Sequence, residues 1–133
     1  MSAVREVLDL FELTKDARRV VRTYSTGMRQ LLGLAAAWLG RPALLLLDEP
    51  SNGLDPAGTR KLRSLLRRAS EHGATVFVSS HVLSEIEQIA DWIGIVNAGR
   101  LVFQGELSVL RDSNPGSLED IFLRLVGSRE AAL

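Results

Sequence analysis

Two acidic residues, Asp48 and Glu49, directly follow a run of leucines. The short, wholly apolar run from Ala43 to Leu47 is typical of a strand that is buried on both faces of a sheet. In an open parallel sheet, ligands bind beyond the carboxyl ends of the strands. An Asp there can hold Mg²⁺, and a Glu beside it can orient or deprotonate an attacking water. A helix-capping acid after a core strand would produce the same pattern.

Two further segments place polar residues at the ends of predicted elements. Ser25 precedes a strongly apolar helical pattern, in which Gly27 would let an anionic ligand approach the free N–H groups of the first turn. His81 follows a second apolar run, residues 75–79. Taken singly, Ser25 and Gly27 are also explained as an N-cap and a turn glycine, and His81 as a structural histidine.

The elements that must position these residues alternate between helices and strands. Helical periodicity predicts helices over residues 3–12, 27–39, 56–72 and 82–91. Short apolar runs predict strands over residues 43–47 and 75–79, followed by a hairpin over 92–104 and a last helix that Ser117 opens through a capping box. Strands separated by helices predict an α/β fold with a mainly parallel sheet, flanking helices and right-handed crossovers.

The composition is that of an ordinary globular protein. The 133 residues are 46% hydrophobic and 24% charged, with 16 basic and 16 acidic side chains. This balance excludes a general polyanion binder and predicts no nucleic-acid partner. The absence of cysteine excludes disulfides and cysteine-based metal sites. Because no linker or internal repeat divides the sequence, we predict one domain over residues 1–133.

The order of these segments resembles that of the ATP-binding cassette (ABC) ATPases over essentially the whole chain. The segment YSTGMRQ (24–30) resembles the family signature motif, and LLLLDE (44–49) resembles Walker B. The segment SNGLD (51–55) resembles the D-loop, and SSH (79–81) resembles the switch-histidine loop. The tyrosine- and methionine-bearing signature, together with the sequence from the switch loop onward, is similar to that of bacterial drug and antibiotic exporters.

The resemblance implies a role for each candidate residue. Asp48 would serve Mg²⁺ through water, Glu49 would be the catalytic base, and His81 would contact the γ-phosphate of ATP. Ser25 and Gly27 would bind the γ-phosphate of a nucleotide that is held by a second ABC ATPase subunit in a head-to-tail dimer.

Asp55 would cross the interface of that dimer and link the two sites. The signature departs from the commonest family form at three positions, because Thr26 stands for a Gly, Met28 for a Gln and Leu31 for a basic residue.

The sequence contains no G-x-x-x-x-G-K-[ST] phosphate loop. The chain is therefore expected to be the second half of an ABC ATPase domain: a partial P-loop NTPase fold that starts just ahead of the signature and lacks the phosphate-loop half. The implied function is the ATP-binding and ATP-hydrolysing subunit of an exporter, inactive alone and held at the cytoplasmic face of the membrane by a permease. ATP and Mg²⁺ are expected only in a complete or complemented cassette, which leaves the chain's own enzymatic activity open.

Two other functions remain open. In one, the chain is a non-enzymatic half-cassette that donates Ser25, Gly27 and Asp55 to a complete partner ATPase. In the other, it belongs to a soluble ABC ATPase that acts on ribosomes or DNA, against which the neutral charge and the exporter-like tail both count.

Overall fold

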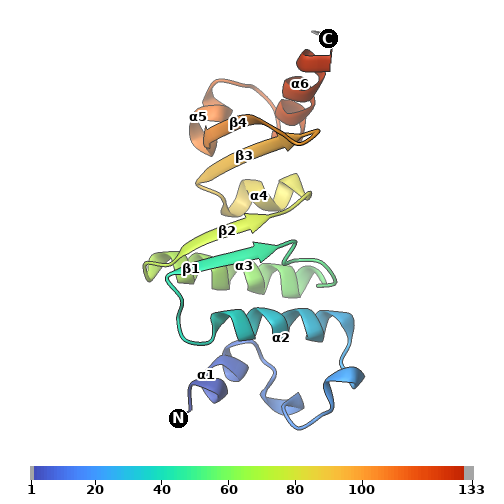
Figure 1. Ribbon diagram of the computed structural model, residues 1–133, viewed down its shortest axis with the longest axis vertical. Helices are drawn as coiled ribbons and strands as arrows, with labels where there is room; N and C mark the ends of the chain where they lie inside the picture. The colour runs from blue at the N-terminus through green and yellow to red at the C-terminus, as the bar shows by residue number, and fades with distance from the viewer. Residues whose placement is uncertain (1, 131–133) are drawn as a thin grey trace. The chain divides into compact units, whose positions relative to one another are not determined.

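The computed structural model describes residues 2–130 and divides into two compact units, the first ending at Ser80 and the second beginning at His81 (Figure 1). The first unit contains α1 (Ala3–Leu10), two short 3₁₀ helices (Thr14–Asp16 and Val21–Thr23), α2 (Thr26–Trp38), β1 (Leu44–Asp48), α3 (Pro56–Glu71) and β2 (Thr75–Ser79). The predicted helices and strands of this unit are confirmed, with ends that differ by one or two residues.

A parallel strand pair forms the centre of the first unit. β1 and β2 are joined through α3, and their register runs from Leu44 opposite Thr75 to Asp48 opposite Ser79. The predicted parallel arrangement is therefore confirmed for these two strands. Because the strands are parallel and in this register, both of their carboxyl ends lie at the same edge of the sheet.

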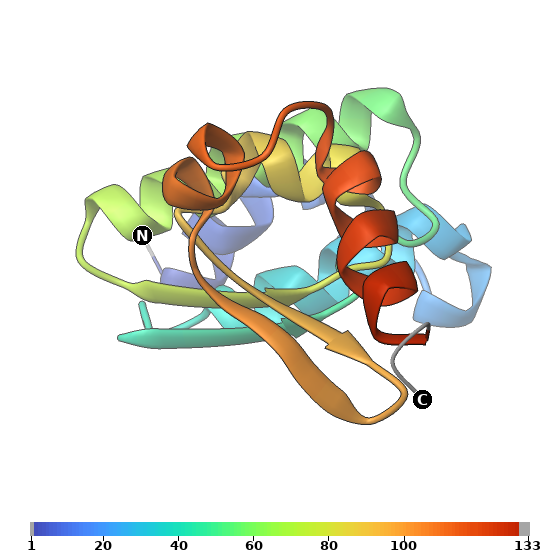
Figure 2. The ribbon, with the colours of Figure 1, turned by 90° about the horizontal axis from the view of Figure 1, so that it is seen from above.

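Local sequence explains where α3 begins and ends. Asp55 is its N-cap, Pro56 occupies the first turn, and Gly73 follows the helix with a φ of +92°. The predicted apolar stripe is buried and consists of Leu62, Leu65, Leu66 and Ala69. Figure 2 shows α3 on one side of the β1–β2 pair, so this stripe covers one face of the sheet.

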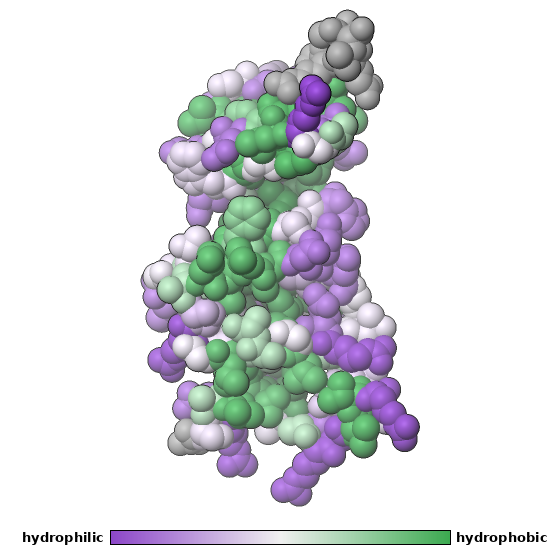
Figure 3. Space-filling view, in the orientation of Figure 1, coloured by the Kyte–Doolittle hydropathy of each residue, from purple (hydrophilic) through white to green (hydrophobic). Residues whose placement is uncertain are grey.

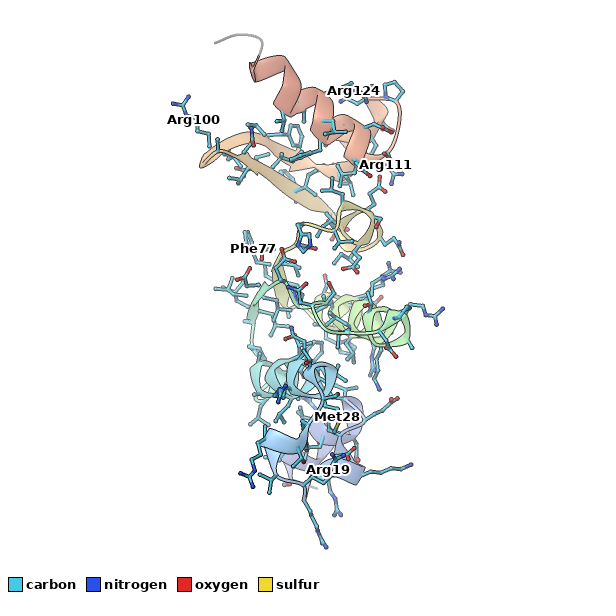
Figure 4. The ribbon with its side chains drawn as sticks, turned by 90° about the vertical axis from the view of Figure 1, so that its right-hand side faces the viewer. Arg19, Met28, Phe77, Arg100, Arg111 and Arg124 are labelled. Carbon is cyan, nitrogen blue, oxygen red and sulfur yellow. The ribbon has the colours of Figure 1, made fainter. Side chains whose placement is uncertain are left out.

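The opposite face of this sheet is exposed, and the prediction of strands buried on both faces is wrong there. Leu45 is 3% exposed, whereas Leu44, Leu46 and Phe77 are 52%, 69% and 67% exposed. In Figure 4, Phe77 points away from α3, and Figure 3 shows apolar surface over the two strands. The apolar sequence indicates that both faces of these strands are suited to burial, whereas the described residues cover only one face of the sheet.

The second unit contains α4 (Leu83–Ile89), β3 (Trp92–Asn97), β4 (Arg100–Glu106), α5 (Leu107–Asp112) and α6 (Leu118–Glu130). The predicted hairpin is confirmed, because β3 and β4 pair antiparallel around a turn in which Ala98 and Gly99 both have positive φ. The core of the second unit consists of Ile93, Ile95, Leu107, Leu110, Leu118 and Ile121. The sequence prediction missed α5, which follows the hairpin directly.

The predicted capping box at the start of α6 is also confirmed. The backbone N–H of Asp120 donates to Ser117 Oγ over 3.2 Å, and the backbone N–H of Ser117 donates to Asp120 Oδ2 over 2.9 Å. The hydrogen bonds from Ser117 lower the pKa of the Asp120 carboxyl.

Among residues 2–130, no helix combines the length and the apolar character that crossing a bilayer requires.

We predict that the exposed sheet face makes the isolated chain self-associate as its concentration rises. Each large apolar side chain left in water forgoes about 1.5–3 kcal/mol of burial energy, and open strand edges favour pairing between chains. Replacing Leu46 by Lys should weaken the association seen in sedimentation velocity. The matched control is Val20→Lys, since Val20 is 63% exposed but lies outside the sheet.

A chain that stays monomeric across the concentration series and unfolds cooperatively above about 50 °C, as ordinary domains do, would contradict the prediction.

Candidate functional site

The carboxyl edge of the β1–β2 pair holds two oxygen-bearing side chains side by side. Asp48 and Ser79 are the last residues of the two strands and lie opposite each other in the register. The hydroxyl of Ser79 donates a hydrogen bond to Asp48 Oδ1. Asp48 therefore lies at the predicted edge, with its carboxylate exposed and oriented by the neighbouring strand. The sequence analysis did not propose Ser79 as a site residue, although a parallel register places some residue of β2 opposite Asp48.

Glu49 lies next to Asp48 in sequence but in a different backbone environment. Its φ of +45° is in the left-handed region, where a non-glycine residue costs about 1–3 kcal/mol. Its backbone N–H donates to Ser79 O over 3.0 Å and to Ser79 Oγ over 3.2 Å. Glu49 Oε2 is buried, whereas the carboxylate of Asp48 is exposed. The chain thus turns sharply after β1 and gives the two adjacent acids different surroundings.

Ser25 caps α2, as predicted. Its Oγ accepts a hydrogen bond from the backbone N–H of Met28 over 3.1 Å, and Ser25 itself is exposed. Figure 4 labels Met28, which lies in this first turn of α2. The exposed helix N-terminus retains the positive end of the helix dipole, which favours an anion.

Gly27 has an intramolecular neighbour that the sequence prediction did not foresee. A Cβ atom added to Gly27 would lie 2.9 Å from the backbone oxygen of Gly53, closer than real Cβ contacts come. The absence of a side chain at Gly27 therefore allows the first turn of α2 to pack on the loop that follows β1. We expected the glycine to admit a ligand, and in this structure it admits a neighbouring backbone segment.

That loop, residues 49–55, is also held by Gln30 of α2. Gln30 Nε2 donates to the carbonyl oxygen of Pro50 over 2.9 Å. At the far end of the loop, Asp55 Oδ1 accepts from the backbone N–H of Gly58 over 2.7 Å and so caps α3. Gln30 lies inside the quoted signature segment, but its type gave no indication of a contact 20 positions away.

His81 follows β2 and opens the second unit, where its side chain is exposed. The other predicted site residues all belong to the first unit, in which the contacts above join the capped end of α2 to the loop after β1. Within the described part of the chain, no group of three or more His, Asp and Glu side chains gathers in a metal-binding arrangement. The available donors beside β1, from Asp48 and Ser79, are hard oxygens of the type that Mg²⁺ prefers.

Comparison with known proteins identifies the family to which the chain belongs. Residues 2–87 match the family described as "AAA domain, putative AbiEii toxin, Type IV TA system". The bacitracin transport ATP-binding protein of Enterococcus faecalis is 52% identical over 114 residues, which are 85% of this chain and 37% of that protein. The daunorubicin resistance ATP-binding protein DrrA3 of Streptomyces coeruleorubidus is 39% identical over 128 residues, which are 96% of this chain and 40% of that protein.

A solved structure described as the ATP binding subunit of an ABC transporter has the same fold. It superposes with a TM-score of 0.84 at 28% identity, over 93% of this chain and 53% of that one. The chain belongs to the AAA domain family and, among the proteins that share this fold, to the ATP-binding proteins of ABC transporters. It spans about two-fifths of the length of the two transport and resistance proteins that it matches.

We predict that Asp55 contributes to folding stability in its own right. Asp55→Ala should lower the free energy of unfolding by about 1 kcal/mol, because the N–H of Gly58 loses its capping acceptor. Asp55→Asn should retain most of the stability, since Asn is an equally good N-cap. Denaturant titration measures both.

The control for this prediction is Glu71→Ala at the opposite end of α3, where removal of a negative charge should be neutral or slightly stabilising. Equal losses for Asp55→Ala and Asp55→Asn would contradict a capping role.

Proposed function

We propose that the chain is the carboxyl-terminal half of an ATP-hydrolysing cassette of a bacterial exporter. The observation on which this rests is the carboxyl edge of the β1–β2 pair, where Asp48, Glu49 and Ser79 lie together in a chain whose relatives bind ATP for transport. Edges of this type are where parallel sheets bind ligands.

Asp48 and Ser79 are the residues that would hold Mg²⁺. The fit rests on the hydrogen bond between them, which presents oxygen donors at an exposed edge. A bound Mg²⁺ supplies charge neutralisation of the phosphate oxygens. Ser79 orients Asp48 so that a carboxylate oxygen remains available to the ion or to its water.

Glu49 is proposed as the general base. A base must hold a fixed orientation toward the water that it activates, and Glu49 is fixed by its left-handed backbone and by two hydrogen bonds from its N–H to Ser79. The partly buried carboxylate then accepts the proton as the water attacks the γ-phosphate. Backbone strain at this position is consistent with a functional requirement for a non-glycine residue.

The remaining residues are proposed to act across a dimer. Ser25 and Gly27 would present the N-terminus of α2 to the γ-phosphate of a nucleotide held by a second ATPase subunit, which suits the exposed, capped helix end. Asp55 would contact that subunit, and His81 would contact the γ-phosphate in the chain's own site. A permease would hold the assembly at the cytoplasmic face of the membrane.

The amino-terminal half would supply the phosphate loop. Such a loop provides about four charge-assisted hydrogen bonds, each worth about 1.5–3 kcal/mol. A nucleotide complex with a Kd of ~10 μM is worth only about 7 kcal/mol, so these bonds account for most of its affinity. The 133-residue chain alone should therefore bind Mg-ATP no more tightly than about millimolar and should not turn it over.

A second function is favoured by the same absence of a phosphate-loop motif from the sequence. In it, the chain is a non-enzymatic half-cassette that donates Ser25, Gly27 and Asp55 to a complete partner ATPase. Turnover by a cassette built on this chain's own Glu49 distinguishes the two functions.

The test joins this chain to the part of the Enterococcus faecalis relative that precedes the matching 114 residues. This chimeric cassette should hydrolyse ATP. Glu49→Gln should abolish hydrolysis and leave ATP binding intact, because Gln keeps the shape of Glu but cannot accept the proton. Asp48→Asn should instead weaken the Mg²⁺-dependent part of ATP binding.

This experiment has two controls. One is the isolated chain, and the other is Glu85→Gln, which replaces a carboxylate of α4 in the second unit. Undiminished turnover in the Glu49→Gln cassette would refute the assignment of the base.

We predict that substitutions at Ser25 act on the partner subunit's site. In a mixed dimer of cassettes, Ser25→Arg puts bulk where the neighbouring γ-phosphate would approach the helix N-terminus. Nucleotide trapping should therefore fall more at the partner subunit's site than at the variant subunit's own site. Ser2→Arg, which alters the N-cap of α1, serves as the matched control. Equal losses at both sites in single-site trapping would contradict the assignment.

A further inference from the structure

The first turn of α2 and the loop after β1 are joined by more contacts than the proposed chemistry uses. Gln30 Nε2 lies 2.9 Å from the carbonyl oxygen of Pro50, and this bond joins residues 20 positions apart. Gln30 is partly buried and Pro50 is buried. The hydrogen bond is therefore partly shielded from solvent and competes less with water than an exposed bond would.

A pair of glycines brings the two backbones into direct contact beside this bond. A Cβ on Gly27 would lie 2.9 Å from Gly53 O, and a Cβ on Gly53 would lie 2.8 Å from Thr26 Cγ2. Gly53 also has a φ of +79°, which favours glycine for a second reason. Thr26, one of the departures from the common signature, thus occupies the space that the missing side chain of Gly53 leaves.

The loop that receives these contacts is short and internally hydrogen-bonded. The N–H of Asn52 donates to Glu49 O over 3.1 Å, and the N–H of Leu54 donates to Ser51 O over 3.0 Å. The loop begins at Glu49 and ends at Asp55, the N-cap of α3. A displacement at Pro50 or Gly53 therefore reaches both ends of the loop through few rotatable bonds.

We propose that Thr26, Gly27 and Gln30 are positioning residues that lock the first turn of α2 to the loop 49–55, so that the two segments move as one rigid block. The consequence for catalysis rests on the proposed function: Ser25 and Gly27 face a partner's nucleotide, while Glu49 serves the chain's own. The block therefore links the occupancy of the partner's site to the orientation of the chain's own base.

The first test measures the block itself in the full 133-residue chain, by hydrogen exchange at low concentration. Gly53→Ala should speed exchange of the Asn52 and Leu54 amides by about tenfold, because its Cβ collides with Thr26 Cγ2. Thr26→Ser removes only that methyl group. Adding it to Gly53→Ala should restore most of the protection, apart from the part lost to backbone strain.

Gly40→Ala is the matched control for backbone strain. Gly40 has a φ of +90°, like Gly53, but nothing lies within 4 Å of its ideal Cβ position. Its replacement should leave the exchange of the Asn52 and Leu54 amides unchanged. The rigid block is overturned if Thr26→Ser gives no rescue, or if Gly40→Ala has the same effect as Gly53→Ala.

The second test measures positioning in the chimeric cassette. Gln30→Ala should lower kcat for ATP hydrolysis about tenfold and leave KM within about twofold, because the base is displaced while nucleotide binding by the other half is unaffected. Gln30→Glu should be at least as damaging, since its carboxylate offers no N–H to Pro50 O and repels it. Gln104→Ala, on the exposed face of β4, is the matched control.

A matching change in KM, or full activity of Gln30→Glu, would overturn the positioning role of Gln30. If the unmodified cassette has no ATPase activity, the proposed function fails instead. The hydrogen-exchange test still decides whether the block exists, because it needs no turnover.

Discussion

The parallel register between β1 and β2 is the constraint on which the site depends. It places Asp48 opposite Ser79, so one strand orients the carboxylate that the other strand presents. Ser79, the residue of β2 that ends the register, also receives the turn at Glu49, whose N–H donates to Ser79 O and Oγ. A shift of one residue would turn Asp48 to the other face of the sheet and would break all of these bonds.

Two of the candidate residues serve folding as well as the proposed chemistry. Ser25 caps α2 through Met28, and Asp55 caps α3 through Gly58. Both N-caps are exposed at their helix ends, where anions and partner subunits can also approach. The structural and functional explanations of these residues are therefore compatible, and their effects separate only when stability and activity are measured on the same variants.

Local sequence was sufficient to predict most of the elements, α5 excepted, but not the contacts between them. The stripe on α3, the hairpin and the capping box at Ser117 and Asp120 each depend on residues that are close in sequence, and all three are confirmed. The bond from Gln30 to Pro50 depends on how α2 packs on a distant loop, which periodicity does not describe. The exposure of Phe77 likewise depends on what covers the sheet, since an apolar run indicates only what a strand is suited to.

The left-handed backbone at Glu49 has a consequence for how this sequence would change under selection. Glycine and asparagine adopt that conformation at lower cost than glutamate. A library of variants sorted only for resistance to unfolding would therefore lose Glu49, while under the proposed function one sorted for turnover of a complete cassette would retain it. The position at which the two libraries diverge would then mark where this fold gives up stability for the proposed chemistry.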